Sequence, residues 1–553
     1  MKKDILIGGA WPYANNSLHL GHLAGLISGD ILARYHRING DNVLYVSGTD
    51  CHGTPITERA KKEGRTPKEI DQYHEEFLKT FKAMDFSYDL YSKTETEYHA
   101  KKVQEIFKKL YDNGYIYEKI EPQAYCEKCN KFLQDREIQI KCPECGEITK
   151  ADQCDNCGHT PSVEELKDGV CLVCGSKAVE KNNKNLYFAL SRFQDIIQAN
   201  TDKCKQFWRV NARNETEKYL KQGLKDRAVT RDLDWGIEIP LPGYETKRMY
   251  VWIEAVLGYL TDTMKLAEEN GFSWEDFWKE GHNNKIYMCH GKDNIVFHSI
   301  IFNGLLAGLE DNFHLVDVIV STEYLNINDE KISKSKGNGI TALEMLEKYN
   351  TDSLRFHIIN NGPEKKDTNF TIEEFERTHN NEILNKFGNL VNRTVSMVNK
   401  YFECNVPEYV GTLNEVDKEF EEFTTNKLKD VEELIEKYQM SNALQELWTI
   451  ISRTNKYIDE TRPWELAKNE ETDKLKSSMY HLIENIRKIA ICLLPFMENT
   501  SKDILRQIGM PEDLRTWNSL YEYDKLHGIK VIEKGEPIFM RKNVEEELEY
   551  LRN

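Results

Sequence analysis

The feature that most constrains how this chain can fold is a set of four Cys-x-x-Cys pairs between residues 126 and 174. The pairs are Cys126/Cys129, Cys142/Cys145, Cys154/Cys157 and Cys171/Cys174. Thiolates at this spacing are typical ligands of tetrahedral structural zinc, and two four-cysteine sites would use all eight. Buried free thiols and a redox dithiol are less favoured explanations. We therefore predict two structural Zn²⁺ ions in a small inserted domain.

The residue that follows each second cysteine supports this interpretation. Three of them are Gly146, Gly158 and Gly175, and the fourth is Asn130. These residue types tolerate the left-handed backbone that a tight metal-binding turn needs. A nested arrangement, in which the outer pairs share one ion and the inner pairs share the other, fits a segment that leaves a folded core and returns to it.

Composition places the chain among large globular proteins with several domains. Its 553 residues correspond to about three to four domains, and 40% hydrophobic residues with only 31 Gly and 14 Pro exclude collagen-like and mostly disordered chains. No apolar run approaches the roughly 18 residues of a membrane helix, and the first residues do not form an export signal. We therefore expect a cytoplasmic protein whose 13 cysteines are not disulfides.

The formal net charge is −18, from 74 Lys and Arg against 92 Asp and Glu. Such a balance argues against passive coating of nucleic acid, although it leaves room for local basic loops. Neither DNA nor a membrane is an expected partner. An acidic bulk with basic loops suits a nucleic-acid partner that binds and then leaves.

Strand–helix–strand patterns occur on both sides of the cysteine-rich segment. The predicted elements are strands at 4–10, 42–46, 286–290 and 314–321, and helices at 18–37 and 294–306. This pattern favours an α/β protein with a Rossmann-type nucleotide-binding core that is interrupted by an insert. Beyond about residue 375, strand patterns nearly vanish and apolar residues keep helical spacing, as in Leu444, Leu447 and Ile451. A helix bundle is expected there.

Two segments carry residues suited to phosphate chemistry. The first, from Pro12 to His22, lies between the first strand and its helix and contains Gly21 and two histidines one turn apart. Backbone N–H groups at a helix start favour phosphate, and the histidines can donate to phosphoryl oxygens. The second, Lys331 to Gly339, has three lysines and two glycines, and lysine side chains can neutralise a departing pyrophosphate.

Together these segments resemble the class I aminoacyl-tRNA synthetases. His19-Leu20-Gly21-His22 is similar to the family's HIGH motif, and Lys331-Ile332-Ser333-Lys334-Ser335 is similar to its KMSKS motif. The resemblance implies that His19, His22, Lys331 and Lys334 are catalytic. It implies that ATP, with Mg²⁺, is bound by His19, Gly21, His22, Lys331, Ser333, Lys334 and Ser335.

Within that class the chain is similar to the methionyl-tRNA synthetases. Four blocks match in order: 10–15 (AWPYAN), 48–55 (GTDCHGTP), 250–255 (YVWIEA) and 291–298 (GKDNIVFH). The resemblance implies that Asp50 holds the ammonium of methionine, and that the pocket is formed by Ala10, Trp11, Tyr13, Asp50, Trp252, Ala255, Tyr259 and His298. A thioether favours polarizable aromatic walls. Trp11 and Val256 depart from the pattern, because many relatives carry Leu and Pro there.

In the helical region, Asn389, Arg393 and Trp464 resemble the family's anticodon-reading residues. Stacking on an aromatic ring and hydrogen bonds to unstacked bases are the usual means of reading single-stranded RNA. The resemblance implies a catalytic core at 1–117 and 231–320, interrupted by a connective insertion with the zinc knuckles at 118–230. It implies that the KMSKS loop and stem-contact region follow at 321–378. An anticodon-binding bundle at 379–515 and a tail at 516–553 would complete the chain. The chain ends without the dimerising oligonucleotide-binding domain of some relatives, so a monomer is expected.

The function that these features imply is methionine–tRNA ligation. Methionine and ATP would give methionyl-adenylate and pyrophosphate, and methionine would then pass to the 3′-terminal adenosine of tRNA(Met). The alternatives are an isoleucine, leucine, valine or cysteine synthetase and a nucleotidyltransferase that adenylates a small acid without tRNA. A zinc-bearing nucleic-acid module without catalysis is a further alternative, although it would have no use for Asp50 or the two ATP motifs.

Overall fold

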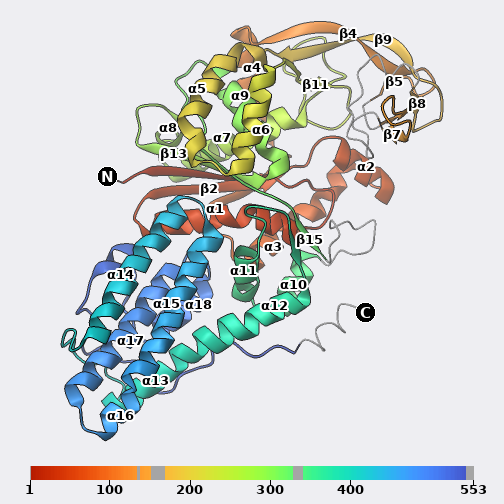
Figure 1. The fold of residues 1–553 in the computed structure, drawn as a ribbon. Coiled ribbons are helices and arrows are strands. Elements are labelled where there is room, and N and C mark those ends of the chain that lie inside the picture. The colour runs from red at the N-terminus through yellow and green to blue at the C-terminus, as the bar shows by residue number, and fades with distance from the viewer. Residues whose placement is uncertain (1, 134–136, 151–168, 328–340, 544–553) are drawn as a thin grey trace.

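The computed structural model describes residues 2–133, 137–150, 169–327 and 341–543 (Figure 1). At its centre lies a parallel sheet with the strand order β14-β13-β1-β2-β3. The strands are β1 (Asp4–Gly9), β2 (Asn42–Thr49), β3 (Leu90–Lys93), β13 (Asn284–Gly291) and β14 (Val318–Thr322). This is the doubly wound order of a Rossmann-type fold. The insert therefore separates β1 from its neighbour β13 in sequence, while the sheet keeps them side by side.

Both faces of this sheet are covered, which explains its near-continuous apolar strands. In β1, Ile5 and Ile7 pack on the side of α1 (Leu20–Ile38), whereas Leu6 packs on the side of α7 (Val251–Asn270). Figure 1 shows α4, α5, α6, α7 and α9 above the sheet and the long helical bundle below it. The helices near the sheet are α2 (Thr54–Glu63), α3 (Gln72–Ala83), α4 (Glu97–Asp112), α8 (Glu275–Trp278) and α9 (Phe302–Gly308).

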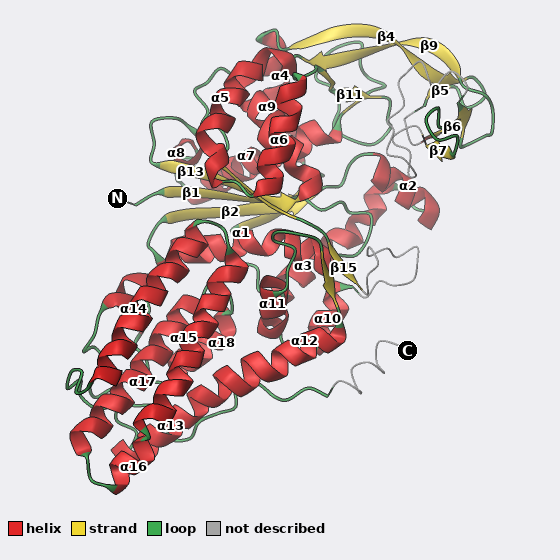
Figure 2. Cartoon of the chain, in the orientation of Figure 1, coloured by secondary structure: helices red, strands yellow, loops and turns green. Residues whose placement is uncertain are grey.

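The insertion leaves the core along a long antiparallel ribbon, shown at the top of Figure 2. Its strands are β4 (Ile116–Cys126) and β9 (Val179–Phe188), in register from Ile116 opposite Phe188 to Tyr125 opposite Val179. At the tip lie the short strands β5 (Lys131–Phe132), β6 (Ile138–Lys141), β7 (Ile148–Lys150) and β8 (Val170–Cys171). After the ribbon, α5 (Gln194–Cys204) and α6 (Val210–Gln222) pack back on α9 and β14 of the core. The insertion thus has a distal cysteine-rich part and a proximal helical part.

The helix expected at 294–306 is interrupted in the structure. A 3-10 turn at Lys292–Asn294 is followed by a π-helix at Phe297–Ile301 and then by α9. The ring Nδ1 of His298 donates to the carbonyl oxygen of Asn294, four residues earlier, at 2.9 Å. A π-turn often occurs at functional sites. This π-helix contains His298, whose ring lies within hydrogen-bond distance of the Tyr259 hydroxyl.

Small strands and helices connect the core to the bundle. They are β10 (Arg227–Ala228), β11 (Thr230–Arg231), β12 (Arg248–Met249), β15 (Leu325–Ile327), β16 (Thr368–Phe370), α10 (Ala342–Lys348), α11 (Thr351–Asn360) and α12 (Ile372–Thr378). Among them, α11 joins the parts through buried Arg355. Its guanidinium donates to Asp30 in α1 at 2.6 Å and to the carbonyl oxygen of Phe496 in the bundle at 2.7 Å.

The helix bundle predicted beyond about residue 375 is present and extends away from the sheet (Figure 1). Its helices are α13 (Asn389–Phe402), α14 (Glu415–Glu436), α15 (Met440–Thr461), α16 (Pro463–Lys468), α17 (Thr472–Leu493) and α18 (Glu498–Gln507). Leu444, Leu447 and Ile451 are fully buried in it. The segment after α18 returns along the bundle, where the backbone N–H of Lys542 donates to Asn380. Among the described residues, no helix is both long and apolar enough to cross a membrane.

Candidate active site

One cleft lies where β1 and β13 end side by side. The helix after β1 covers one face of the sheet and the helical segment after β13 covers the other, so a crevice opens between them. A cavity of about 380 Å³ occupies this position. It is lined by the segment after β1, including Tyr13, His19 and His22, by Asn294 after β13 and by Thr322 at the end of β14.

His19 and His22 begin α1 in an unusual capping arrangement. The Nδ1 atom of His19 accepts from the backbone N–H of Gly21, and the Nδ1 atom of His22 accepts from the backbone N–H of His19, both at 3.1 Å. Each Nδ1 therefore carries a lone pair, and each neutral ring carries its proton on Nε2. Burial lowers the pKa of His22 to about 4. His22 is thus neutral at physiological pH, with its ring proton on Nε2.

Four of the residues predicted to bind methionine line this cavity: Ala10, Trp11, Tyr13 and Trp252. Trp252 stacks on Phe297, with 3.5 Å between ring centroids, and meets Tyr13 edge to face at 6.2 Å. The lining of this cavity does not include the other four predicted residues, which are Asp50, Ala255, Tyr259 and His298. The cavity wall is therefore aromatic on the side where a thioether is expected.

Behind the wall, Tyr259 and His298 form a fixed pair. Because Nδ1 of His298 donates to the carbonyl of Asn294, its Nε2 accepts from the hydroxyl of Tyr259 at 2.8 Å. Burial lowers the pKa of His298 to about 4 and raises that of Tyr259 well above its usual value. Both side chains are consequently neutral at physiological pH, as suits a pocket for an uncharged side chain.

Trp11 is accommodated by two glycines. A Cβ atom added to Gly48 or to Gly258 would lie 2.4 Å from the six-membered ring of the Trp11 indole. The indole is thus clamped between β2 and α7, and it meets Tyr259 edge to face. Val256, the second departure from the family pattern, is buried in the core on the α7 side of the sheet and does not line the cleft.

Asp50 lies directly after β2 and is only 4% exposed. One carboxylate oxygen accepts from the backbone N–H of His52 at 3.1 Å. Its position is set by backbone bonds to the segment after β1, because Asp50 donates to the carbonyl of Pro12 and accepts from Ala14. Burial, followed by the nearby Glu254 carboxylate, raises the pKa of Asp50 well above its usual value. An ammonium group beside it would stabilise the charged form.

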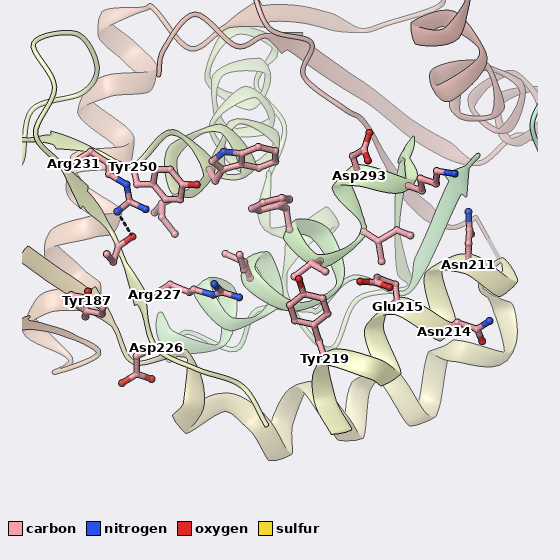
Figure 3. A pocket seen from close by; sticks show the side chains of 18 residues that line it. Tyr187, Asn211, Asn214, Glu215, Tyr219, Asp226, Arg227, Arg231, Tyr250 and Asp293 are labelled. Carbon is pink, nitrogen blue, oxygen red and sulfur yellow. Dashed lines mark hydrogen bonds between the residues drawn. The ribbon is translucent and has the colours of Figure 1, made fainter. Parts of the chain in front are cut away.

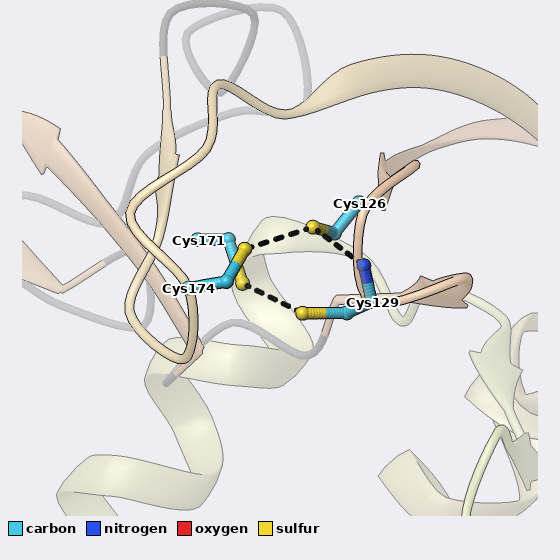
Figure 4. A group of neighbouring side chains, drawn as sticks. All are labelled: Cys126, Cys129, Cys171 and Cys174. Atoms are coloured by element: carbon cyan, nitrogen blue, oxygen red, sulfur yellow. Dashed lines mark hydrogen bonds between the residues drawn. The ribbon is translucent and has the colours of Figure 1, made fainter.

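The outer cysteine pairs meet at the tip of the ribbon (Figure 4). The sulfur atoms of Cys126, Cys129, Cys171 and Cys174 all lie within 4.8 Å of one another. Cys126 and Cys174 are 3.4 Å apart, and Cys129 and Cys171 are 3.9 Å apart. Tetrahedral zinc at about 2.3 Å from each sulfur separates them by about 3.8 Å. The four thiols therefore lie close to the arrangement that a zinc ion requires, with shifts of up to about 1 Å.

The turns around these cysteines have the backbone that the sequence suggested. Asn130 and Gly175 have φ values of 53° and 73°, and Gly146, after the inner cysteine Cys145, has 77°. Cys142 is buried and Cys145 is exposed. Their expected partners, Cys154 and Cys157, lie outside the described residues, as do Lys331, Ser333, Lys334 and Ser335 of the second phosphate motif.

Comparison with known proteins identifies the family. A family model for "tRNA synthetases class I (M)" matches residues 5–395, and one for the "anticodon binding domain of methionyl tRNA ligase" matches residues 406–550. The chain is 47% identical to methionine–tRNA ligase 1 of Alkaliphilus oremlandii, over 94% of each chain. It is 42% identical to methionine–tRNA ligase 2 of Bacillus cereus, over 99% of each chain.

The chain belongs to the methionyl-tRNA synthetases. It is thus a methionine–tRNA ligase of class I, as the sequence motifs predicted. Its fold is similar to that of Mycobacterium tuberculosis methionyl-tRNA synthetase solved in complex with methionyl-adenylate, with a TM-score of 0.81 and 23% identity. The match covers 98% of this chain and 100% of the other.

The predicted anticodon residues of this synthetase lie on the bundle, far along the chain from the cleft. Asn389 and Arg393 are exposed one turn apart on α13, and Trp464 on α16 is 42% exposed. Asn455 of α15 donates to the carbonyl of Lys386, and from this contact both helices run to the end of the bundle that carries α16 (Figure 1). Arg393 and the last residue of α15 each lie about 10 Å beyond this contact, measured along the helix axes. This brings Arg393 and Trp464 to the same level of the bundle.

A second, larger cavity of the synthetase was not foreseen from the sequence. It has a volume of about 1110 Å³ and lies between the insertion and the core (Figure 3). Arg227, Tyr219 and Asn214 line it, and the guanidinium of Arg231 lies 4.0 Å from the ring centroid of Tyr250. Trp252 and Asp293 line both cavities. Its lining comes from residues between 187 and 301, so no local motif could have predicted it.

Proposed function

We propose that the cleft between β1 and β13 carries out both steps of methionine–tRNA ligation. In the first step, a carboxylate oxygen of methionine attacks the α-phosphorus of ATP and pyrophosphate leaves. In the second, a ribose hydroxyl of the terminal adenosine of tRNA attacks the methionyl carbonyl and AMP leaves. The observation that supports the proposal most directly is the lining of one cavity. His19 and His22, with their protons on Nε2, line it together with the aromatic residues Tyr13 and Trp252. No covalent intermediate with the protein is needed, because positioning and charge stabilisation dominate such transfers.

The proposed role of His19 and His22 follows from their fixed tautomer. Their Nε2–H groups would donate to oxygens of the α-phosphate as negative charge develops there. The backbone bonds at Nδ1 hold the rings before substrate arrives, so little reorganisation is needed in the transition state. Lys331 and Lys334 would follow the leaving pyrophosphate, a role proposed from the sequence motif. Mg²⁺ would enter with ATP and neutralise part of the phosphate charge.

Methionine would lie with its ammonium at Asp50 and its side chain against the aromatic residues. The buried carboxyl of Asp50 favours a cationic partner, because an ammonium removes the cost of an isolated buried charge. Trp252, Tyr13 and Trp11 would surround the thioether, with Ala255, Tyr259 and His298 closing the pocket from behind. The neutral Tyr259–His298 pair offers no charge that a competing polar side chain could use.

The larger cavity is proposed to receive the unpaired 3′ end of tRNA. It adjoins the adenylate cleft through Trp252 and Asp293, and it offers aromatic, guanidinium and amide groups that suit single-stranded RNA. Asn389, Arg393 and Trp464 are proposed to bind the anticodon at the far end of the bundle. Arg227→Ala should slow transfer to tRNA and leave adenylate formation unchanged.

The cysteine cluster is proposed to hold one structural zinc, with Cys142, Cys145, Cys154 and Cys157 holding a second. The outer cluster supports the first ion directly through its sulfur spacing. A bound ion would tie the two ends of the cysteine-rich segment together at the ribbon tip. Zinc would supply cross-linking of the fold here, because Cys126, Cys129, Cys171 and Cys174 would fill all four positions of the outer site.

The activity is tested by ATP–pyrophosphate exchange with a panel of amino acids. Exchange that depends on methionine, with much weaker exchange for isoleucine, leucine, valine and cysteine, supports the proposal. Equal or faster exchange with one of those four amino acids would contradict it. Charging of a tRNA(Met) transcript in the same preparation distinguishes the synthetase from an enzyme that adenylates a small acid without tRNA.

A further inference from the structure

A buried cluster of one carboxylate and two histidines lies behind the proposed methionine site. Glu254 of α7 is fully buried. One of its oxygens is 2.7 Å from Nδ1 of His52, and the other is 3.1 Å from Nε2 of His99. His52 follows β2, His99 lies in the first turn of α4, and Glu254 lies two residues after Trp252. Three elements distant in sequence therefore meet at one carboxylate.

The hydrogen bonds fix where most protons of this cluster lie. The hydroxyl of Thr261 donates to the carbonyl of Gly258, so it accepts from Nδ1 of His99 at 2.9 Å. Nδ1 of His99 is thus protonated, and a further proton must lie between its Nε2 and Glu254. Burial acts to raise the pKa of Glu254, but His52 and His99 outweigh it, so the pKa is lowered and the carboxylate is charged. A buried carboxylate that is compensated in this way is stable without solvent.

The cluster is tied to Asp50 through His52. The ring of His52 contacts Glu254, while its backbone N–H donates to the carboxylate of Asp50 at 3.1 Å. The next residue back, Cys51, is held from the other side, because Trp235 donates to its carbonyl at 2.7 Å. Any movement of His52 away from α7 would therefore move the carboxylate that is proposed to bind the ammonium.

The same cluster also reaches the aromatic wall. The ring of His99 stacks on Trp11 with 6.2 Å between centroids and 29° between planes. Glu254 shares α7 with Trp252, Ala255 and Tyr259. The ammonium side and the thioether side of the pocket are thus joined by one buried hydrogen-bonded group. Such groups are sensitive to loss of one member, because the remaining polar atoms stay buried without a partner.

We propose that Glu254, with His52 and His99, is a positioning residue that holds Asp50 at the distance from α7 that the ammonium of methionine requires. The inference rests on the proposed role of Asp50. Glu254 does not touch the substrate, and it acts through the segment from Asp50 to His52. The carboxylate has a second effect through its charge. Burial and then Glu254 raise the pKa of Asp50, whereas Glu254 raises the pKa of His52 against the opposing effect of burial.

Two substitutions separate position from charge. Glu254→Gln keeps the shape and both hydrogen bonds, because the amide oxygen can accept from His52 and the amide N–H can donate to Nε2 of His99. It removes the negative charge of Glu254 and the proton between that carboxylate and Nε2 of His99. Glu254→Ala removes both contacts. A matched control is Glu421→Gln in the bundle, where the carboxylate is 2.7 Å from Nε2 of buried His481.

The assay is ATP–pyrophosphate exchange with methionine, together with inhibition by 4-(methylthio)butanoate, which is methionine without its ammonium. Glu254→Ala should raise the KM for methionine about 10- to 100-fold, the effect of losing a hydrogen bond to a charged group. Inhibition by the des-amino analogue and the KM for ATP should change less than about twofold. Glu421→Gln should leave all three unchanged. If Glu254→Ala weakens methionine and the analogue equally, its role is merely structural and the proposal fails.

The pH profile gives a second readout that does not depend on how well the alanine variant folds. In Glu254→Gln the charge that raises the pKa of Asp50 is gone, so the rising limb of kcat/KM for methionine should move to lower pH. Other charges in this region are Glu95, which acts on His52, and Lys93 and Asp71, which lie near Cys51; all three stay unchanged in this variant. An unmoved limb would contradict the proposal.

If the proposed role of Asp50 is wrong, the variants will give a different pattern of methionine KM values. Asp50→Asn should raise the methionine KM and leave inhibition by the des-amino analogue unchanged. If Asp50→Asn has no effect on methionine, the ammonium does not bind at Asp50, whatever the Glu254 variants do. If Asp50→Asn behaves as expected and Glu254→Ala does not, only the positioning role of Glu254 is overturned.

Discussion

Substitution of His22 can separate its structural role from its catalytic role. Its Nδ1 accepts the backbone N–H of His19 at 3.1 Å, which caps α1, while its Nε2–H is proposed to donate to the α-phosphate. Asn and Gln both place a side-chain oxygen where it can accept that backbone N–H. Only Gln is long enough to place an N–H donor near the position of Nε2. Ala can do neither.

The expected magnitudes follow from these two contacts. Loss of the cap in His22→Ala should lower the free energy of unfolding by about 0.5–1 kcal/mol, and Asn and Gln should lower it less. Loss of one transition-state donor should slow adenylate formation about 10²- to 10³-fold in the Asn and Ala variants. The Gln variant should retain at least ten times the activity of the Asn variant, because it keeps a donor at the right end of the side chain.

The assay combines single-turnover methionyl-adenylate formation with urea unfolding of each variant. His357→Gln in α11 is a matched control, since burial also lowers the pKa of His357 to about 4 and this residue does not line the described cleft. Its rate should match that of the unmodified protein, even if its stability falls. Equal rates for the Asn and Gln variants, or rates that follow stability alone, would refute the assignment of His22 Nε2 as a phosphate donor.

Three further results are expected. Burial and Glu254 raise the pKa of Asp50, and below that pKa its carboxyl is neutral. The KM for methionine should therefore fall as pH rises and then level off. A flat KM profile between pH 5 and pH 9 would argue against binding of the ammonium at Asp50. Metal analysis should give about two zinc ions per chain, and a Cys126→Ser variant should lose one of them. Chelation of the zinc should unfold the ribbon tip. Eight titratable thiols in the native protein would contradict both zinc sites. Trp464→Ala should reduce tRNA charging about 5- to 150-fold by loss of base stacking. Pyrophosphate exchange should stay unchanged, because Trp464 is 42% exposed and is not needed for packing. A parallel fall in charging and exchange would show a structural role for Trp464.

The parts of the fold that the sequence predicted are those with local patterns. The apolar runs of the parallel strands, the helical spacing of the bundle and the paired cysteines all have short periods that can be read directly. The start of α1 was less clear, because its cap is His19, and histidine is not among the usual capping residues. The expected helix began at residue 18, whereas α1 begins at Leu20.

The remaining features depend on contacts between distant segments. Glu254 meets His52 across 202 residues and His99 across 155, so no motif contains the three together. The π-helix that contains His298 has no sequence period, and the bond from its ring Nδ1 to the carbonyl of Asn294 could not be read from the sequence. The room for Trp11 comes from two glycines on different elements, Gly48 and Gly258. Sequence patterns located the residues of the pocket, but not the way in which they support one another.

The most direct test of the account is a crystal structure of the protein after incubation with ATP and methionine. The account predicts methionyl-adenylate in the cleft between β1 and β13, with its phosphate within hydrogen-bond distance of Nε2 of His22. Its ammonium should contact Asp50, and its thioether should lie against Trp252 and Tyr13. An adenylate bound in the larger cavity, or in the cleft with its ammonium away from Asp50, would contradict the central claim.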